Sequence, residues 1–215
     1  MKGVVALLAS PMVVRVMALA CFAGSAAAQT APAKPDAAKG QAIVTKVCAA
    51  CHGADGNSPS PANPKLAGQS PEYIARQLVA FKANKERKNP VMFGMASPLS
   101  NDDIQDVATY FGAQKAKEGT ARNKDTVAIG RKLYRAGDAS KGIAACASCH
   151  GATGAGVPVQ YPRLAGQYAE YTELQLKAFR SKDRANDGNR MMRSVADKLT
   201  DSDIAAVADY IAGLR

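Results

Sequence analysis

The sequence predicts an all-α protein made of two tandem copies of one small domain. Segments of the first half return about one hundred residues later, and "CAACHG" at 48–53 and "PKLAGQ" at 64–69 return as "CASCHG" at 146–151 and "PRLAGQ" at 162–167. Apolar residues in both halves follow helical spacing, and no segment alternates apolar and polar residues as a strand would. Because the repeat is much longer than a solenoid unit, it indicates two duplicated domains.

The first residues have the pattern of a secretory signal. An apolar run at 16–23 is followed by small residues and by an A-x-A-type cleavage site at 26–28. We therefore predict a signal peptide at 1–28, removed together with Cys21, and a flexible lead-in at 29–36. A retained membrane anchor is the alternative, but the apolar run is shorter than the ~20 residues that a spanning helix needs.

The two copies should form two helical domains. The first is expected at 37–114 and the second at 128–215, joined by the polar, charged linker 115–127. In each copy we expect a helix that runs into the cysteine motif, a middle helix and a last helix. Their predicted ranges are 37–48, 71–83 and 101–113 in the first copy, and 126–136, 169–181 and 201–212 in the second.

Several of these helices carry capping signals. Ser70 before Pro71 is typical of an N-cap followed by proline in the first turn. Ser100 and Thr200 each stand three residues before an aspartate, as in a capping box. The last helix of the first copy also has an apolar stripe with the spacing i, i+3, i+4 and i+7, formed by Ile104, Val107, Ala108 and Phe111.

A C-x-x-C-H motif occurs once in each copy. Its residues are Cys48, Cys51 and His52 in the first copy, and Cys146, Cys149 and His150 in the second. Two thiols on one helical turn can add to the two vinyl groups of a porphyrin, and the histidine can then bind the iron. A zinc site and a thiol–disulfide catalyst are the alternatives, but neither requires a histidine directly after both pairs. The motifs therefore predict two covalently bound haem c groups.

The second axial ligand of each haem iron is expected to be a methionine. Beyond the signal peptide no cysteine or histidine lies outside the motifs, which leaves methionine and lysine as the main candidates. The methionines there are Met92, Met95, Met191 and Met192. Met92 and Met192 align with each other in the repeat, whereas the other two align with valines. A core methionine exchanges easily with valine and a ligand does not, so we assign Met92 and Met192 as ligands.

Pro64 and Pro162 each follow the motif histidine by twelve residues. A ligating histidine usually donates a hydrogen bond from its other ring nitrogen, and the carbonyl of such a proline is a candidate acceptor. A plain loop proline is the alternative, and the residues alone leave the choice open.

These motifs resemble the dihaem cytochromes c4. The resemblance rests on "CAACHGADGNS", "NPKLAGQ", "MFGMA", "YPRLAGQ" and "MRSVADKLTDSDIA", and it covers nearly all of the chain after the signal peptide. It implies two class I cytochrome c domains, each wrapped around one haem, with the haems near one another. It also implies axial ligation by Met92 and Met192, and a role for the Pro64 and Pro162 carbonyls in holding the histidines.

The two copies differ at one packing position. Residue 44 is Val in the first copy, where the second has Tyr134. We therefore expect looser helix packing in the first domain. The residues around the two predicted methionine ligands also differ, so we expect two different reduction potentials.

The sequence favours an electron carrier rather than an enzyme. Closed His/Met sites keep oxygen and peroxide off the iron, and no histidine remains for distal acid–base chemistry. A dihaem peroxidase is one alternative. A dihaem subunit of a larger dehydrogenase, such as a sulfide-oxidising flavocytochrome, is the other.

The setting follows from the signal peptide and from the family resemblance. We expect a periplasmic monomer that carries electrons from a quinol-oxidising complex toward a terminal oxidase, with peripheral membrane association left open. The net charge is +10, but the basic residues are scattered among acidic ones. No basic stripe indicates a nucleic-acid partner.

Overall fold

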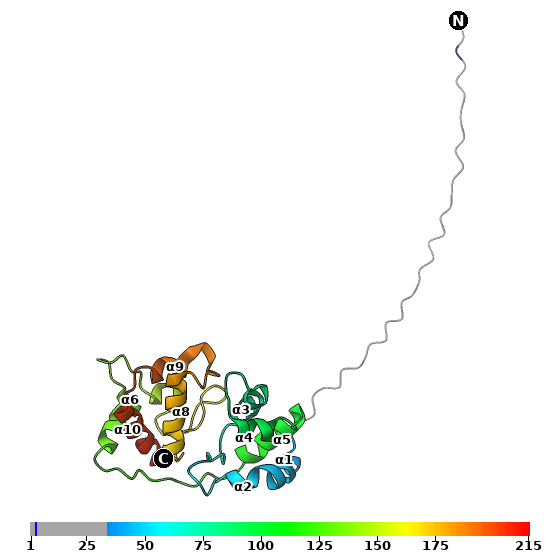
Figure 1. The fold of residues 1–215 in the computed structure, drawn as a ribbon, viewed down its shortest axis with the longest axis horizontal. Coiled ribbons are helices and arrows are strands. Elements are labelled where there is room, and N and C mark those ends of the chain that lie inside the picture. The colour runs from blue at the N-terminus through cyan, green and yellow to red at the C-terminus, as the bar shows by residue number, and fades with distance from the viewer. Residues whose placement is uncertain (1–2, 4–33) are drawn as a thin grey trace. The chain divides into compact units, whose positions relative to one another are not determined.

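The computed structural model describes residue 3 and residues 34–215. Almost all of the predicted signal peptide, with Cys21, therefore lies outside the described residues. Within 34–215 the regular secondary structure is helical, and only isolated bridges occur in place of strands (Figure 1). This confirms the prediction of an all-α fold.

The first half of the described chain contains five α-helices. They are α1 (Ala37–Ile43), α2 (Ala49–His52), α3 (Pro71–Ala83), α4 (Pro90–Ala96) and α5 (Asn101–Gly112), with a π-helical turn at Val44–Cys48. The second half repeats this order (Figure 1). Its helices are α6 (Val127–Ala136), α7 (Ala147–His150), α8 (Ala169–Ser181), α9 (Met191–Ala196) and α10 (Asp201–Ala212), with a 3₁₀ turn at Gly188–Arg190.

The predicted middle and last helices agree closely with the observed ones. Ser70 caps α3 by accepting a hydrogen bond from the Tyr73 backbone. Both capping boxes form, because Ser100 and Thr200 each exchange hydrogen bonds with the aspartate three residues later. The sequence did not predict the short helices α4 and α9, which carry the methionines.

Each domain closes where its first helix crosses its last. α1 packs on α5, and α6 packs on α10. A Cβ atom built on Gly40 would lie 2.1 Å from the Asp106 carbonyl oxygen, and one on Gly130 would lie 2.1 Å from that of Ala206. The backbones therefore approach so closely that only glycine fits at either crossing.

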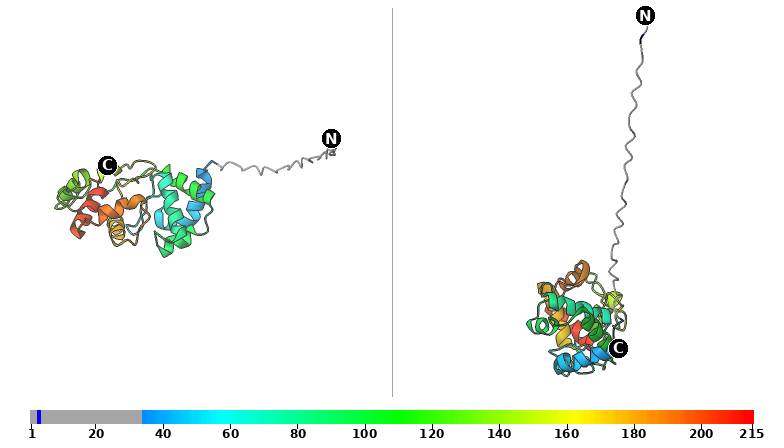
Figure 2. Two further views of the ribbon diagram at one scale, coloured as in Figure 1. Left: turned by 90° about the horizontal axis from the view of Figure 1, so that it is seen from above. Right: turned by 90° about the vertical axis from the view of Figure 1, so that its right-hand side faces the viewer.

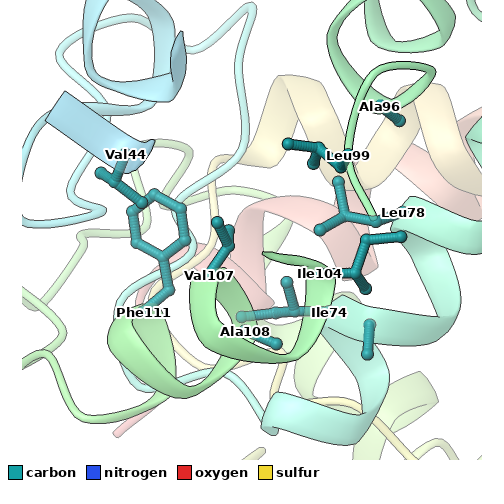
Figure 3. Packing of buried hydrophobic residues seen from close by; sticks show 10 residues of the cluster. Val44, Ile74, Leu78, Ala96, Leu99, Ile104, Val107, Ala108 and Phe111 are labelled. Atoms are coloured by element: carbon teal, nitrogen blue, oxygen red, sulfur yellow. The ribbon is translucent and has the colours of Figure 1, made fainter. Parts of the chain in front are cut away.

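Each domain has its own hydrophobic core. In the first, buried side chains from α3, α5 and the end of α4 meet Val44 (Figure 3). In the second, the corresponding cluster includes Leu133 and Tyr134 of α6 and Leu176 of α8. The largest fully buried side chains are Phe111 in the first core and Tyr134 in the second.

The two domains lie against each other (Figure 2). They exchange matching hydrogen bonds. The Gln69 side chain binds both backbone groups of Arg163, at 2.9 Å to the carbonyl oxygen and 2.8 Å from the amide nitrogen. The Gln167 side chain binds Lys65 in the same way, at 3.0 Å for both contacts. We call these four bonds the glutamine clamp. It grips the residue directly after Pro64 in one domain and after Pro162 in the other.

The segments that flank the domains are held by side chains. Asp36, at the end of the predicted lead-in, caps α1. In the predicted linker, the Lys117 amide donates to the Asn57 side chain at 2.7 Å, and the Arg122 amide donates to Asp209 at 2.8 Å. The connecting segment is therefore bound to both domains.

Candidate haem centres

The histidine of each C-x-x-C-H motif lies at the end of a single helical turn. α2 ends at His52 and α7 at His150, and both side chains are buried. The next residue of each is a glycine with positive φ, Gly53 at 76° and Gly151 at 80°. A left-handed residue of this kind ends the helix directly after the histidine.

Both histidines are oriented by a proline carbonyl. His52 Nδ1 lies 3.0 Å from the Pro64 oxygen, and His150 Nδ1 lies 3.0 Å from the Pro162 oxygen. A carbonyl can only accept, so Nδ1 must carry the proton and donate it. The Nε2 lone pair is then free to bind a metal, which is the arrangement expected of a ligating histidine.

The surroundings also keep the two imidazoles neutral. Burial lowers the pKa of His52 and His150, and the hydrogen bond to the proline carbonyl opposes this shift only in part. Since a metal ligand must offer an unprotonated nitrogen, this environment suits iron binding near neutral pH.

The first cysteine of each motif lies in an apolar environment. Burial raises the pKa of the Cys48 thiol and of the Cys146 thiol to about 11. A thiol–disulfide catalyst needs the opposite shift, toward a reactive thiolate. The buried thiols therefore fit thioether attachment better than a thiol–disulfide catalyst. Within the described part of the chain, no three His, Cys, Asp or Glu side chains gather as a metal site.

The predicted methionine ligands lie on α4 and α9. Met92 is partly buried and packs on the first core, beside which Cys48 also packs. Met192 and Cys146 are likewise partly buried and pack on the second core. Met95 and Met191 are 42% and 40% exposed. The packing supports the choice of Met92 and Met192, and their ligation of iron stays a prediction.

The donor set of each domain fits haem c. Each domain offers a pair of thiols, a neutral buried imidazole and a thioether, and one thiol and the thioether pack on its apolar core. These are the groups that attach a porphyrin covalently and close both axial positions of its iron.

Sequence reasoning missed two groups beside the motifs. Tyr161 meets the His150 ring at 6.0 Å between centroids, and its hydroxyl lies 3.8 Å from Met191 Sδ. In the first domain, the Ser58 hydroxyl donates to the Cys51 carbonyl at 2.9 Å. The tyrosine could have been noticed in the sequence, because the two copies differ at this position. The first copy has Asn63 where the second has Tyr161.

Comparison with known proteins agrees with this geometry. The sequence model of the cytochrome c family matches residues 37–114 and 127–215. The chain is 46% identical over 186 residues to cytochrome c4 of Thiocapsa roseopersicina, covering 86% of this chain and 95% of that protein. The chain belongs to the cytochrome c4 family. The crystal structure of reduced recombinant cytochrome c4 from Pseudomonas stutzeri superposes with a TM-score of 0.81 at 45% identity, covering 85% of this chain and 100% of that one.

A second kind of relative is named for a different role. The thiosulfate dehydrogenase electron acceptor of Thiomonas intermedia (strain K12) is 39% identical over 204 residues, covering 92% of this chain and 90% of that protein.

As a cytochrome c4-type protein, the chain carries two covalently bound haem c groups, attached through Cys48 and Cys51 and through Cys146 and Cys149. It is a dihaem electron carrier.

Proposed function

We propose that the chain carries electrons between redox proteins of the periplasm, using two haems that each have one histidine and one methionine ligand. The observation that carries this proposal is the repeated 3.0 Å contact between the motif histidine and the proline carbonyl, in both domains. It supports two equivalent iron sites, each with an oriented imidazole. A methionine beside the core can close the second position of each site.

The bound haem supplies one-electron chemistry, because its iron changes between the ferric and ferrous states. The residues of the chain set the conditions for that change. His52 and His150 are fixed by their proline contacts, so the ligand does not have to reorient between states. Met92 and Met192 supply thioethers, which raise the reduction potential relative to a second imidazole.

Exchange of the predicted ligands tests the proposal. In Met92→His or Met192→His, the near-red band of the oxidised Met–iron bond should fall by half, and the potential of one haem should drop. Met95→His and Met191→His are the matched controls, because those side chains lie partly exposed beside the ligand positions. An unchanged spectrum and redox titration in Met92→His would remove that ligand from the proposal.

The exported location and the domain limits form part of the proposal. We place the signal peptide at 1–28, the lead-in at 29–36, the domains at 37–114 and 128–215, and the linker at 115–127. Among the described residues no helix is long and apolar enough to cross a membrane. N-terminal sequencing of the protein from a periplasmic extract tests the cleavage site. Recovery with Met1 still attached would contradict it.

The route we favour runs from a quinol-oxidising complex to a terminal oxidase, as the family resemblance implies. A second route is favoured by one specific observation, the similarity to a thiosulfate dehydrogenase electron acceptor. On that route the chain would receive electrons from a dehydrogenase, as a dedicated acceptor or subunit. The sulfide-oxidising flavocytochrome predicted as an alternative belongs to the same class.

Reduction kinetics distinguish the two routes. The oxidised protein is mixed either with quinol and membranes that contain the quinol-oxidising complex, or with purified thiosulfate dehydrogenase and thiosulfate. Fast reduction by the membranes alone supports the first route. Fast reduction by the dehydrogenase alone overturns it in favour of the second.

A further inference from the structure

One peptide group lies between the motif histidine of the second domain and a side chain of the first. Its carbonyl end is the Pro162 oxygen, which accepts a hydrogen bond from His150 Nδ1 at 3.0 Å. Its amide end is the Arg163 nitrogen, which donates to Gln69 Oε1 at 2.8 Å. A continuous chain of two hydrogen bonds therefore runs from the histidine, through this peptide group, to a glutamine of the other domain.

The first domain has the same chain of bonds in the opposite direction. His52 Nδ1 donates to the Pro64 carbonyl at 3.0 Å, and the next backbone amide, that of Lys65, donates to Gln167 Oε1 at 3.0 Å. Each histidine is thus connected to a glutamine of the domain to which it does not belong. The glutamine clamp therefore reaches both motif histidines, through one peptide group each.

Neighbouring backbone groups fix the orientation of both glutamine side chains. Gln69 Oε1 also accepts from the Ser70 amide at 3.0 Å, and its Nε2 donates to the Arg163 carbonyl at 2.9 Å. Gln167 Oε1 likewise accepts from the Tyr168 amide at 3.0 Å. The reverse orientation would point an NH2 group at two backbone N–H donors, so the oxygen is the atom that faces the peptide group.

Docking of the domains does not require bonds at these two peptide groups. Arg76 of α3 also bonds across the domain contact, but it donates to the Val159 carbonyl, outside both of them. The clamp instead uses the residue that directly follows each histidine-holding proline, and it does so in both domains. This repeated placement points to a role beyond docking.

Hydrogen bonds that share a peptide group strengthen each other. When the amide end donates, the carbonyl oxygen becomes more negative and accepts more strongly, by about 10–30% per bond. A stronger bond to Nδ1 makes the imidazole a more basic metal ligand. A more basic ligand stabilises ferric iron relative to ferrous iron, so it lowers the reduction potential of that haem.

We propose that Gln69 is a positioning residue for His150, and Gln167 for His52, so that each glutamine lowers the reduction potential of the haem in the other domain. Each acts through one peptide group, which it polarises and holds in place. The proposal rests on the two histidines as iron ligands, as in the proposed function. It does not depend on which methionines are ligands.

The test follows the two histidines of the reduced, isotope-labelled dihaem protein by NMR, because the chain contains no others. In Gln69→Leu, the Nδ1–H signal of His150 should move upfield as its hydrogen bond weakens, while that of His52 stays in place. Gln167→Leu should give the reverse result. Signals that do not move, or that move equally for both histidines, would overturn the proposal.

A redox titration of the same variants measures the effect on the potentials, with each haem followed by its own NMR signals. Gln69→Leu should raise the potential of the haem in the second domain and change that of the first much less. Gln167→Leu should raise the potential of the haem in the first domain. A larger change in the domain that carries the substitution would contradict the crossed arrangement.

Gln77→Leu is the matched control for Gln69→Leu. Gln77 belongs to the same domain and also bonds across the domain contact, where it accepts from Arg184 at 3.2 Å and from Asn186 at 2.8 Å. These bonds involve neither proline peptide group, so both histidine signals should stay in place. Equal shifts in Gln77→Leu and Gln69→Leu would assign the effect to looser docking and overturn the proposal.

The native protein keeps the proposal testable should the variants lose haem. In the reduced state, a scalar coupling through the hydrogen bond should join the Arg163 amide nitrogen to the side-chain carbonyl carbon of Gln69. The matching coupling should join Lys65 to Gln167. Absence of both couplings would mean that the bonds do not form in the dihaem protein, and would overturn the proposal. The methionine exchanges described above leave these bonds intact, so either proposal can fail without the other.

Discussion

The two domains are alike where they face the iron and different where they support it. The histidine–proline contact measures 3.0 Å in both, and the glycine crossing and the capping box occur in both. The two domains differ in their first helix. In the first domain it widens into the π-helical turn Val44–Cys48, and in the second it ends at Ala136, well before Cys146.

The exchange of Val44 for Tyr134 shows how one position is filled in two ways. Both side chains are fully buried, so burial gives no sign of the looser packing we expected in the first domain. The Tyr134 hydroxyl donates to the Gly151 carbonyl at 2.7 Å. In the first domain the comparable hydrogen bond comes from the last helix, where the Tyr110 hydroxyl donates to the Ala54 carbonyl at 3.0 Å.

The methionine helices differ still more. α4 begins with the Asn89–Pro90 pair, and the Asn89 side chain accepts a hydrogen bond from the Met92 amide at 3.0 Å. α9 is held instead by Asp187, which accepts from the Arg193 amide at 2.9 Å and from the Arg193 side chain at 2.7 Å. The comparison teaches that two different local structures can hold a methionine helix in place beside its core.

Removing the proximal ligand should have the largest effect, and an equal one in either domain. His52→Ala and His150→Ala should each leave one haem attached by its cysteines but without its imidazole. The low-spin visible spectrum should therefore fall by half in both variants, while a pyridine haemochrome assay still counts two haems. A normal two-haem spectrum in either variant would show that its histidine is not a ligand. Unequal losses would show that the two sites are not equivalent.

Removing the side chain that holds the methionine helix should destabilise the second domain more than the first. Asp187→Ala leaves a mostly buried arginine without its partner, at a cost of about 3 kcal/mol. Asn89→Ala removes only a helix cap, at a cost of about 1 kcal/mol. Urea unfolding of the dihaem protein measures both. Equal losses would mean that the ion pair adds nothing beyond capping.

The tyrosine hydroxyls should give the smallest effect. Tyr134→Phe should cost about 1 kcal/mol, because a buried hydrogen bond to Gly151 is lost. Tyr110→Phe should cost less than about 0.5 kcal/mol, because its hydrogen bond to Ala54 is exposed and water can replace it. Thermal unfolding of the two variants measures both losses of stability. A larger loss for Tyr110→Phe would reverse this part of the comparison.

Much of the fold could be predicted because its signals are local. The middle and last helices follow from the apolar stripe and from the caps Ser70, Ser100 and Thr200, all of which are visible over a few residues. α4 and α9 escaped prediction because six or seven residues are too few to show a helical stripe. The asparagine–proline pair before α4 was a usable capping signal, and α9 has no counterpart to it.

The candidate site was also predicted only where its signals are local. The attachment cysteines, the histidines and the twelve-residue spacing to Pro64 and Pro162 are sequence patterns, and the repeat displays each of them twice. The pairing of Arg87 with Tyr171, or of Gln69 with Arg163, depends on how the two domains dock. Nothing in a short segment of sequence encodes a contact between residues about ninety positions apart.

The glutamine clamp makes the domain contact self-complementary. Gln69 and Gln167 occupy matching positions of the repeat, and each binds the backbone that the other domain offers at the matching place. A contact in which the same surface serves both sides is what a twofold-symmetric homodimer uses. The contact within this chain therefore has the symmetry of a dimer, although both halves belong to one chain. Each glutamine can be exchanged separately, so the two halves of the contact can be weakened one at a time.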